Sequence, residues 1–442
     1  MKQADLIVLA DYVLTLDDAC TVIEKAAVAV TGNRIEAVGP ADEVTAGYAA
    51  PRTLGGVGRV VFPGLVNTHT HAAMVFFRGL ADDLPLKDWL EGHIWPAEAR
   101  WLSPAFVSDA VELACLEMIR AGITAYNDMY FYGDAVAEST KRLGMRAVVG
   151  SGVVDFPTPT GRDADDYLAK AERFIAGWKA DDLIVPAIAD HSAYACSPET
   201  LKKSKALAER HGVLLQIHLS ETAWEVGEIL SRYGKRPVSH LASLGLLDRN
   251  LLAAHCVHVD DDEIGMLAES GTAVSHCVES NLKLASGVAP VVRMLAAGVK
   301  VTFGTDGAAS NNDLDLLGEM STAAKLHKAV SGDPTALGAR QALLMATRWG
   351  AEAIGLGGIC GSIAPGMAAD IVIADLNGPH LTPLYDVYSH IVYAMHASDV
   401  ETVLVNGTIV LEDRKLVRAD EEEILAKARE WGKKIREAAK KT

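Results

Sequence analysis

Short apolar segments alternate with longer helical patterns through the middle of this chain, and few folds accommodate that alternation. Eight segments have the composition of buried strands, and their ends lie near His71, Met129, Val154, His191, Glu221, His258, Glu279 and Asp306. Helical spacing separates several of them, at residues 103–121, 133–143, 164–180, 197–211, 260–270 and 290–297, and continues after the last at 315–330 and 335–356. Repeated strand–helix units predict parallel strands joined by crossovers, and eight of them predict a closed (β/α)8 TIM-type barrel. A doubly wound sheet is the alternative, but no Gly-x-Gly-x-x-Gly follows an early strand.

β-rich segments flank this alternation on both sides. They occupy residues 6–10, 12–16, 27–30 and 35–38 before it, and 369–375, 400–407 and 408–411 after it. Two such flanks predict one small β-sandwich domain built from both chain termini, residues 1–60 plus 365–420. The barrel then takes residues 61–364 as the catalytic domain. Residues 421–442 are charged with a helical apolar spacing, which predicts a C-terminal surface helix.

The composition favours an enzyme that acts on small molecules. The formal net charge is −17, from 41 basic and 58 acidic side chains, which argues against a nucleic-acid polymer as partner. The six cysteines form no Cys-x-x-Cys pair, which predicts reduced thiols in a cytoplasmic protein. Asp5 and Asp11 interrupt the apolar residues of the N-terminus, so we expect no signal peptide. No stretch approaches the roughly 18 apolar residues of a membrane span, so we expect no membrane partner.

The first strand candidate, FPGLVNTHTH, ends in two histidines one residue apart. Side chains alternate between the faces of a strand, so His69 and His71 should point the same way. Two rigid nitrogen donors on one face at a strand end suit a metal ion. The alternative is a pair of ordinary polar residues that close a strand, and later strand ends favour the metal interpretation.

Those later ends carry groups that complete a site, because the carboxyl ends of barrel strands converge on one mouth. His218 is a candidate third ligand, and Glu221, three residues on, can reach a group bound to the metal. A buried histidine capped by a carboxylate is the alternative. Asp306 is either a fourth ligand or a hydrogen-bond partner of bound water, although an aspartate before glycine is also a plain turn residue. His255 should project into the mouth.

Three further histidines lie near strand ends. His191 closes the fourth strand, His258 is expected to be structural, and His276 either supports its neighbours or takes a direct part in catalysis. Three imidazoles and a carboxylate favour Zn²⁺ with an open position for water, whose pKa zinc lowers to about 7. Glu221 can take the water's proton and deliver it to a ring nitrogen or leaving group. The sequence therefore predicts metal-assisted hydrolysis of a polarised C–N bond.

At this point the chain resembles a known family. The stretches PGLVNTHTHAAMVFFRGLADDLPLKDWL, HCVESNLKLASG and VTFGTDGAASNNDLDL are similar to the amidohydrolase superfamily and, more closely, to its 5′-methylthioadenosine/S-adenosylhomocysteine deaminases. The resemblance covers nearly the whole chain. It implies that Glu221 is the proton shuttle and that His255 orients the attacking hydroxide. It implies one Zn²⁺ per subunit, with iron or manganese as alternatives, bound by His69, His71, His218 and Asp306.

The resemblance also implies the substrate contacts. Trp89 and Glu98 match residues that contact the ribose, and His191 matches one on the purine–ribose side. A single carboxylate can accept both ribose hydroxyls, and a tryptophan offers an apolar wall with one N–H, although a helix core position is the alternative for Trp89. Superfamily barrels with two metals place a carboxylated lysine at the fourth strand, where this chain has His191, so one metal is implied.

The implied reaction is hydrolytic deamination of an adenosine-type nucleoside to the inosine analogue. Protonation of N1 makes C6 electrophilic, hydroxide attacks C6 and ammonia leaves. Another aminohydrolase of the superfamily, of the guanine, cytosine or s-triazine type, is the nearest alternative, and a non-catalytic metal-binding protein is a second. No His-x-Glu with Pro-Cys-x-x-Cys, the signature of the cysteine-ligated deaminases, is present. We expect a homo-oligomer, because the exterior helices are apolar.

Two departures from the family bear on specificity. Members that favour S-adenosylhomocysteine carry two arginines near the third strand; Arg162 matches one of them, but Ser151 stands at the other place. Losing a cation weakens carboxylate binding, so we expect a preference for methylthioadenosine or adenosine. The apolar Met74, with Phe76 and Phe77, either helps to form a methylthio pocket or packs in the core. The second departure, Val278 in place of a common proline, should have little effect.

Overall fold

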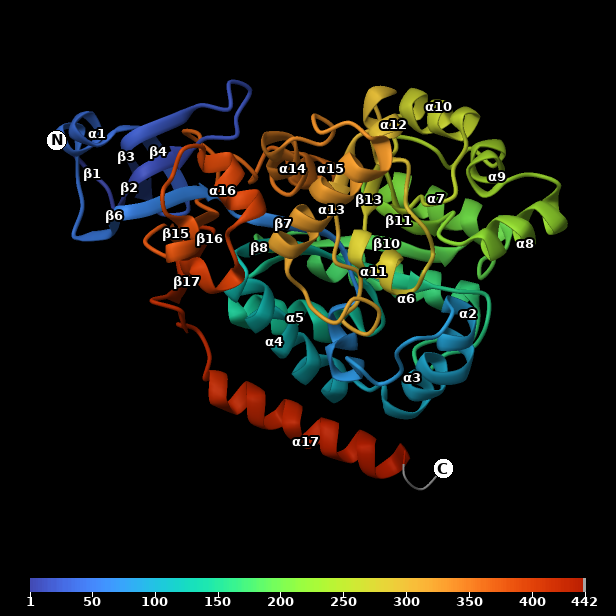
Figure 1. Cartoon of the computed structure of the whole chain (residues 1–442). Coiled ribbons are helices and arrows are strands. Elements are labelled where there is room, and N and C mark those ends of the chain that lie inside the picture. Colours follow the sequence, from blue (N-terminus) through green and yellow to red (C-terminus); the bar gives the residue numbers. More distant parts are fainter. Residues whose placement is uncertain (440–442) are drawn as a thin grey trace.

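Residues 1–439 are described by a computed structural model and form a barrel with a second sheet at one side (Figure 1). The barrel strands pair in chain order. They are β7 (Leu65–Thr70), β8 (Ile123–Tyr130), β9 (Arg146–Val153), β10 (Ile184–Ser192), β11 (Leu215–Leu219), β12 (Leu251–His255), β13 (Ala273–His276) and β14 (Val301–Phe303). The barrel closes beside the end of the last strand, where the Asp306 N–H, three residues after β14, donates to the His69 carbonyl of β7 at 2.9 Å. The predicted (β/α)8 barrel is therefore confirmed.

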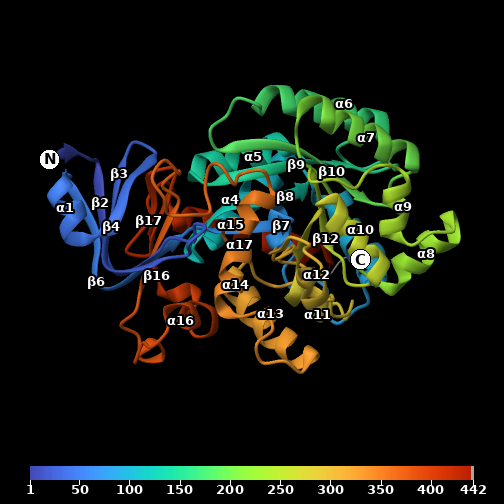
Figure 2. The same ribbon diagram turned by 90° about the horizontal axis from the view of Figure 1, so that it is seen from above.

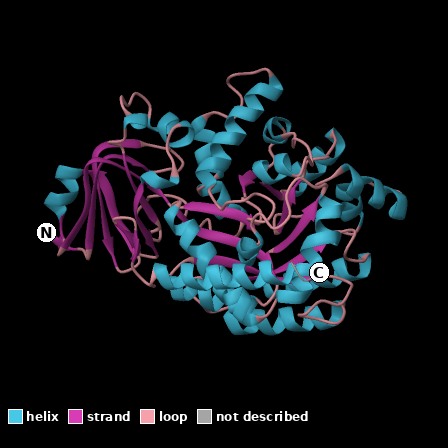
Figure 3. Ribbon diagram, turned by 60° about the horizontal axis from the view of Figure 1, so that its bottom comes forward, coloured by secondary structure: helices cyan, strands magenta, loops and turns pink. Residues whose placement is uncertain are grey.

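Helices surround the barrel strands (Figure 3). In chain order they are α4 (Pro104–Arg120), α5 (Gly133–Leu143), α6 (Ala164–Trp178), α7 (Pro198–His211), α8 (Ala223–Tyr233), α9 (Pro237–Ser243), α10 (Asp261–Ser270), α11 (Val278–Lys283), α12 (Val291–Ala296) and α13 (Leu316–Ser331). Their ends follow local signals in the sequence. α10 begins with a capping box, in which the side chains of Asp260 and Glu263 each accept from the other's N–H. α7 has Pro198 in its first turn and ends at Gly212, which has a φ of +66°.

The barrel interior has an apolar floor and a polar layer above it. At the floor, Val66 belongs to one buried cluster with Ala351 of α15 (Arg348–Ala353), which follows α14 (Ala339–Met345). Above it, the Asn127 side-chain amide donates to the Thr68 carbonyl at 2.8 Å and to Gln216 Oε1 at 2.7 Å. These bonds tie β7, β8 and β11 together just before the strand ends that carry the candidate site.

The second sheet combines strands from both ends of the chain, which lie side by side in Figure 2. In spatial order they are β18 (Lys415–Leu416), β17 (Thr408–Glu412), β16 (Val400–Val405), β15 (Ile371–Asp375), β6 (Arg52–Pro63), β2 (Leu6–Leu14), β3 (Val22–Thr31) and β4 (Arg34–Pro40). The two ends meet where β15 pairs antiparallel with β6. This pairing supports the proposed division into a composite sheet domain, residues 1–60 plus 365–420, and a barrel, residues 61–364. A small pair, β1 (Lys2–Gln3) with β5 (Tyr48–Ala49), lies apart.

β6 leads into the strand that carries the histidine pair, with one glycine between them. A Cβ on Gly64 would lie 2.0 Å from Thr124 Oγ1, so the close passage at this junction requires glycine. The sequence did not predict β6, because Gly55, Gly56 and Gly58 weaken the strand pattern. The segments predicted at 6–10 and 12–16 form the single strand β2, with a shift of register between Ala10 and Tyr12.

The predicted C-terminal helix is α17 (Glu421–Ala439); residues 440–442 of the predicted range lie outside the described residues. Trp431 of α17 packs on Phe106 of α4, with ring centroids 5.2 Å apart, and donates from Nε1 to Asp109 at 2.9 Å. The helix is therefore docked against the barrel along one side. Two further helices are α1 (Ala41–Gly47) and α16 (Val387–Tyr393). No helix within residues 1–439 has both the length and the apolarity that a bilayer crossing requires.

The chain that follows β7 forms helical turns that the sequence did not predict. They are η1 (Ala72–Phe77), α2 (Leu86–Trp89), η2 (Leu90–Ile94) and α3 (Trp95–Trp101). Residues of all four turns line the cavity at the carboxyl ends of the barrel strands. This segment therefore forms one wall of the candidate site.

Candidate metal centre and substrate pocket

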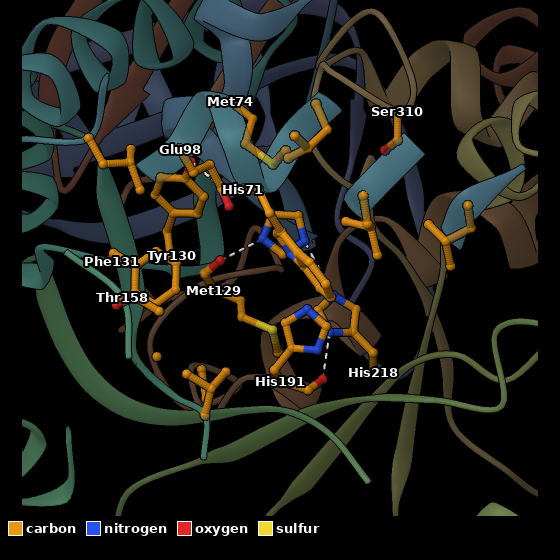
Figure 4. A pocket seen from close by; sticks show the side chains of 18 of the residues that line it. His71, Met74, Glu98, Met129, Tyr130, Phe131, Thr158, His191, His218 and Ser310 are labelled. Atoms are coloured by element: carbon orange, nitrogen blue, oxygen red, sulfur yellow. Dashed lines mark hydrogen bonds between the residues drawn. The ribbon is translucent and has the colours of Figure 1, made fainter. Parts of the chain in front are cut away.

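Three histidines and an aspartate meet at the carboxyl ends of the barrel strands. Figure 4 shows two of the histidines, His71 and His218, close together in the cavity. His71 Nε2 lies 3.2 Å from Asp306 Oδ1 and 3.3 Å from His218 Nε2, and His69 Nε2 lies 3.5 Å from Asp306 Oδ1. His69 lies in β7, His71 directly follows it, His218 lies in β11 and Asp306 lies in the loop after β14. His255, at the end of β12, has its donor atom within 4.8 Å of those of His69 and His218. The structure thus brings together all the residues that the sequence assigned to a metal.

The hydrogen bonds of the imidazoles leave lone pairs for a cation. His71 Nδ1 lies 2.5 Å from the Met129 carbonyl, and His218 Nδ1 lies 2.6 Å from the His191 carbonyl. A carbonyl only accepts, so both Nδ1 atoms carry a proton, and both Nε2 atoms face the centre of the cluster, where each offers a lone pair when the ring is neutral. His69 Nε2 is buried without a hydrogen-bond partner. Three such nitrogens beside a carboxylate fit a divalent ion of the zinc type.

The Asp306 carboxylate stabilises positive charge within this cluster, as the pKa values of the histidines show. Burial lowers the pKa of His69 to about 4. At His71 burial is the largest single effect and acts in the same direction, but the hydrogen bond and charge of Asp306, with the Met129 carbonyl and the charge of Asp128, together outweigh it and raise the pKa to about 9. The carboxylate therefore stabilises one positive charge here, for which a proton and a metal ion compete.

Hydrogen bonds from two serines fix the orientation of the Asp306 side chain, so it is not a plain turn residue. Its Oδ2 accepts from the Ser280 hydroxyl at 2.7 Å and from the Ser310 hydroxyl at 3.0 Å, which leaves Oδ1 toward the histidines. Its φ of +62° places it in the left-handed region, which is strained for an aspartate. The surrounding loops thus hold the carboxylate in one orientation, as a ligand position requires.

Glu221 lies beside the cluster in a loop that a second glutamate supports. Its Oε2 is 3.9 Å from His255 Nε2, and burial raises its pKa. The Glu225 carboxylate accepts from the backbone N–H groups of Ser220 and Glu221, at 2.9 and 2.8 Å. Sequence reasoning missed Glu225, although Thr222-x-x-Glu225 is a capping pattern that could have revealed it.

His255 has a fixed tautomer. Its Nδ1 lies 3.0 Å from Asn281 Oδ1 in α11, so Nε2 is directed at Glu221 and the histidine cluster. Asn281 is another residue that the sequence did not single out, because its role depends on a contact between β12 and α11. His276 lies elsewhere: its Nε2 is 3.0 Å from His327 Nε2 of α13, and it does not line the cavity.

A cavity of about 360 Å³ opens onto the cluster. One end presents His71, His191, His218, Glu221, His255 and Asp306, and the rest of the wall is mostly apolar. Aromatic side chains form much of that wall, with Trp95 and Phe156 in contact at a centroid distance of 5.9 Å. Among the described residues that line the cavity there is no lysine and no arginine. The size and lining suit a small organic molecule with an apolar part.

The cavity contains three of the substrate contacts assigned from the sequence. Trp89 lines it, but its Nε1 donates to the Ala81 carbonyl at 3.0 Å, so it offers a ring face rather than an N–H. Glu98 lines it, and burial raises its pKa to about 7. His191 lines it next to His218, with its own pKa lowered by burial to about 4. All three remain assignments that substrate binding must test.

Other predicted residues lie outside the cavity. The Arg162 side chain is 84% exposed, 3.5 Å from Asp166, and Ser151 is not in the lining. Of the three apolar residues after β7, Met74 lines the cavity, whereas Phe76 and Phe77 pack on Phe106 with centroid distances of 5.3 Å. The two phenylalanines are therefore core residues.

Barrels that present such a histidine–aspartate cluster, with a buried glutamate in reach, form a class of metal-dependent hydrolases. This chain belongs to the amidohydrolase family, whose sequence model matches residues 60–410. Within the family it is similar to a protein of Thermodesulfovibrio yellowstonii named 5-methylthioadenosine/S-adenosylhomocysteine deaminase. The identity is 52% over 432 residues, which cover 97% of this chain and 98% of the relative.

Solved structures agree with this placement. An adenosine deaminase from Xanthomonas campestris with bound zinc has a TM-score of 0.97 and 41% identity, and covers 98% of this chain and 99% of its own. An atrazine chlorohydrolase from Arthrobacter aurescens complexed with zinc has a TM-score of 0.90 and 26% identity, and covers 97% and 100%. The family resemblance predicted from the sequence is therefore confirmed.

Proposed function

We propose that the protein is a metal-dependent deaminase of adenosine-type nucleosides. It replaces the 6-amino group of 5′-methylthioadenosine, adenosine or S-adenosylhomocysteine with oxygen and releases ammonia. The observation that carries the proposal is one cavity that holds both the histidine–aspartate cluster with Glu221 and, in its wall, Glu98 beside Trp89. The name of the Thermodesulfovibrio relative supports the substrate class, and the zinc bound in the Xanthomonas structure supports zinc as the metal. The single histidine–aspartate cluster suits one ion per subunit.

A divalent metal, when bound by His69, His71, His218 and Asp306, supplies a water of lowered pKa as the nucleophile for C6. Glu221 takes a proton from that water and gives it to N1 of the purine, which makes C6 electrophilic. Its burial raises its pKa, so that it can hold the proton between the two transfers. After C6 has been attacked, the same carboxylate takes the second proton from the new hydroxyl group on C6 and gives it to the amino group, which leaves as ammonia when the C6–N bond breaks.

Other residues orient the reactants. Asn281 keeps the His255 Nδ1 proton, so Nε2 can accept a hydrogen bond from the attacking water. Glu225 fixes the turn that carries Glu221. The apolar wall around Trp89 limits access of bulk water to the reacting atoms.

A spectrophotometric screen with metal analysis of the same sample tests the proposal. We expect adenosine and methylthioadenosine to be deaminated, and guanine, cytosine and s-triazines to be left unchanged, because only a nucleoside reaches Glu98 with its ribose. We also expect about one zinc per subunit. Deamination of a free base or an s-triazine, but of no nucleoside, would contradict the substrate class.

Among the nucleosides, methylthioadenosine and adenosine should exceed S-adenosylhomocysteine in kcat/KM by about tenfold, because the cavity offers its carboxylate no cation. Ser151→Arg is the matched variant, because Ser151 directly precedes Gly152, which lines the cavity, and a long side chain there can extend toward it. The variant should raise kcat/KM for S-adenosylhomocysteine alone. A parent enzyme that prefers S-adenosylhomocysteine would show this preference to be wrong.

We further propose that the enzyme works in the cytoplasm as a homo-oligomer. The six cysteines are free, and five of them are buried, which suits a reducing compartment. Val330 of α13 and Leu230 of α8 are exposed apolar side chains on barrel helices. Light scattering on the purified protein measures the assembly directly.

A further inference from the structure

Two successive residues at the end of β8 hold two different parts of the candidate site (Figure 4). The Met129 carbonyl accepts from His71 Nδ1 at 2.5 Å, so it orients a residue of the metal cluster. The next residue, Tyr130, donates from its hydroxyl to Glu98 Oε1 at 2.6 Å. The end of one strand therefore relates the metal cluster to the carboxylate in the cavity wall.

Glu98 depends on this contact more than a strand residue would. It belongs to α3, in the segment of short helical turns that follows β7. Among the described residues, Tyr130 is the hydrogen-bond partner of its carboxylate. A glutamate side chain has three rotatable bonds, whereas Tyr130 is 5% exposed and fixed by packing at the strand end. The tyrosine thus fixes one carboxylate oxygen and leaves acceptor sites on both oxygens for further donors.

We propose that Tyr130 is a positioning residue that holds Glu98 in place for the ribose hydroxyls and so sets the distance between sugar and metal centre. The inference rests on the proposed function. A nucleoside presents adjacent 2′ and 3′ hydroxyl donors at a fixed distance from C6. A carboxylate fixed at the matching distance binds them while C6 lies at the metal centre. A mobile carboxylate would bind the sugar without placing the base.

Electrostatics point the same way. Burial raises the pKa of Glu98 to about 7, and the hydrogen bond from Tyr130 acts against that rise, as does the nearby His71. The bond therefore favours the ionised carboxylate, which is the stronger acceptor. The alternative role for Tyr130 is packing alone, since its ring lies 6.2 Å from that of His71 and 5.6 Å from that of Phe131.

Tyr130→Phe separates the two roles, because it removes the hydroxyl and keeps the ring. With adenosine we expect kcat/KM to fall about tenfold, mostly through KM. With 2′,3′-dideoxyadenosine, which lacks both donors, we expect a change of less than about twofold. Packing alone predicts equal losses with the two substrates, and equal losses, or no loss, would overturn the assignment.

Tyr126→Phe is the matched control. Tyr126 is a buried residue of the same strand, and its hydroxyl bonds to Thr140 of α5, outside the cavity. Tyr126→Phe should alter the melting temperature but leave unchanged the ratio of kcat/KM for adenosine to kcat/KM for 2′,3′-dideoxyadenosine. In a Glu98→Ala background, Tyr130→Phe should have no further effect on that ratio.

Two more measurements complete the test. If Tyr130→Phe does not fold, a crystal structure of the parent with inosine decides instead: Glu98 should keep its bond to Tyr130 while it binds the ribose, and a Glu98 that leaves Tyr130 would overturn the proposal. A parent that deaminates neither nucleoside would overturn the proposed function and this assignment with it. A parent active on adenosine with an unchanged ratio in Tyr130→Phe would overturn the assignment alone.

Discussion

Glu221→Gln should lower kcat by about 10²–10⁴-fold while zinc content and fold stay unchanged, the range typical of a lost general acid–base group. The amide has nearly the same shape, so the buried site remains packed. It cannot accept the proton of the attacking water or deliver one to N1, because it does not titrate. KM should change little, since Glu221 lies at the metal cluster rather than in the cavity wall that surrounds the sugar. Single-turnover kinetics with methylthioadenosine measure the rate of the chemical step, and metal analysis measures the zinc content.

Glu228→Gln provides the comparison for that result. Glu228 lies on α8, seven residues after Glu221, and pairs with Arg232 at the surface with an N–O distance of 2.6 Å. It removes the same charge without touching the cavity, so activity should stay within about twofold. A Glu221→Gln protein as active as the parent would show the proton-transfer role to be wrong. An active parent with an inactive, zinc-loaded variant would exclude a purely metal-binding protein.

The barrel could be predicted because its evidence is local. Each buried strand is a short apolar run, and residues such as His71, His191 and Asp306 mark where these runs end. Because parallel strands expose their carboxyl ends on one side, the order of these ends along the chain already places them together. β6 could not be predicted, because its glycines remove the local strand pattern. Its evidence is not local, since the strand forms by pairing with β2 and β15.

The residues of the candidate site also differ in whether local sequence could predict them. The metal-cluster residues could be predicted because each carries its chemistry in its own side chain. Tyr130, Glu225 and Asn281 could not, because each acts through a partner distant in sequence or through a backbone group. Trp89 and Arg162 show the limit for substrate contacts: the first has its N–H satisfied by Ala81, and the second has its cation paired with Asp166.

Removal of the metal should abolish activity, and zinc should restore it. His218→Ala should reduce bound zinc well below one per subunit and lower kcat/KM by more than about 10³-fold, because the reaction then lacks a water of lowered pKa. The Nε2 of His218 faces the cluster, 3.3 Å from His71 Nε2, while its Nδ1 bonds to the His191 carbonyl. Metal analysis and activity after dialysis against a chelator measure both effects.

His276→Ala is the control that tests whether the loss of zinc is specific to His218. His276 is also a buried histidine at a strand end, but it pairs with His327 and lies outside the cavity. Its removal should lower stability through the cavity it leaves while zinc content stays at the parent level. Equal zinc loss in both variants would mean that any buried histidine of the barrel supports the metal through the fold. Loss of zinc in His218→Ala alone would mean that zinc binding depends on the four side chains at the strand ends. The structure predicts this outcome, because the Nε2 atoms of His71 and His218 face each other and His69 Nε2 is buried without a hydrogen-bond partner.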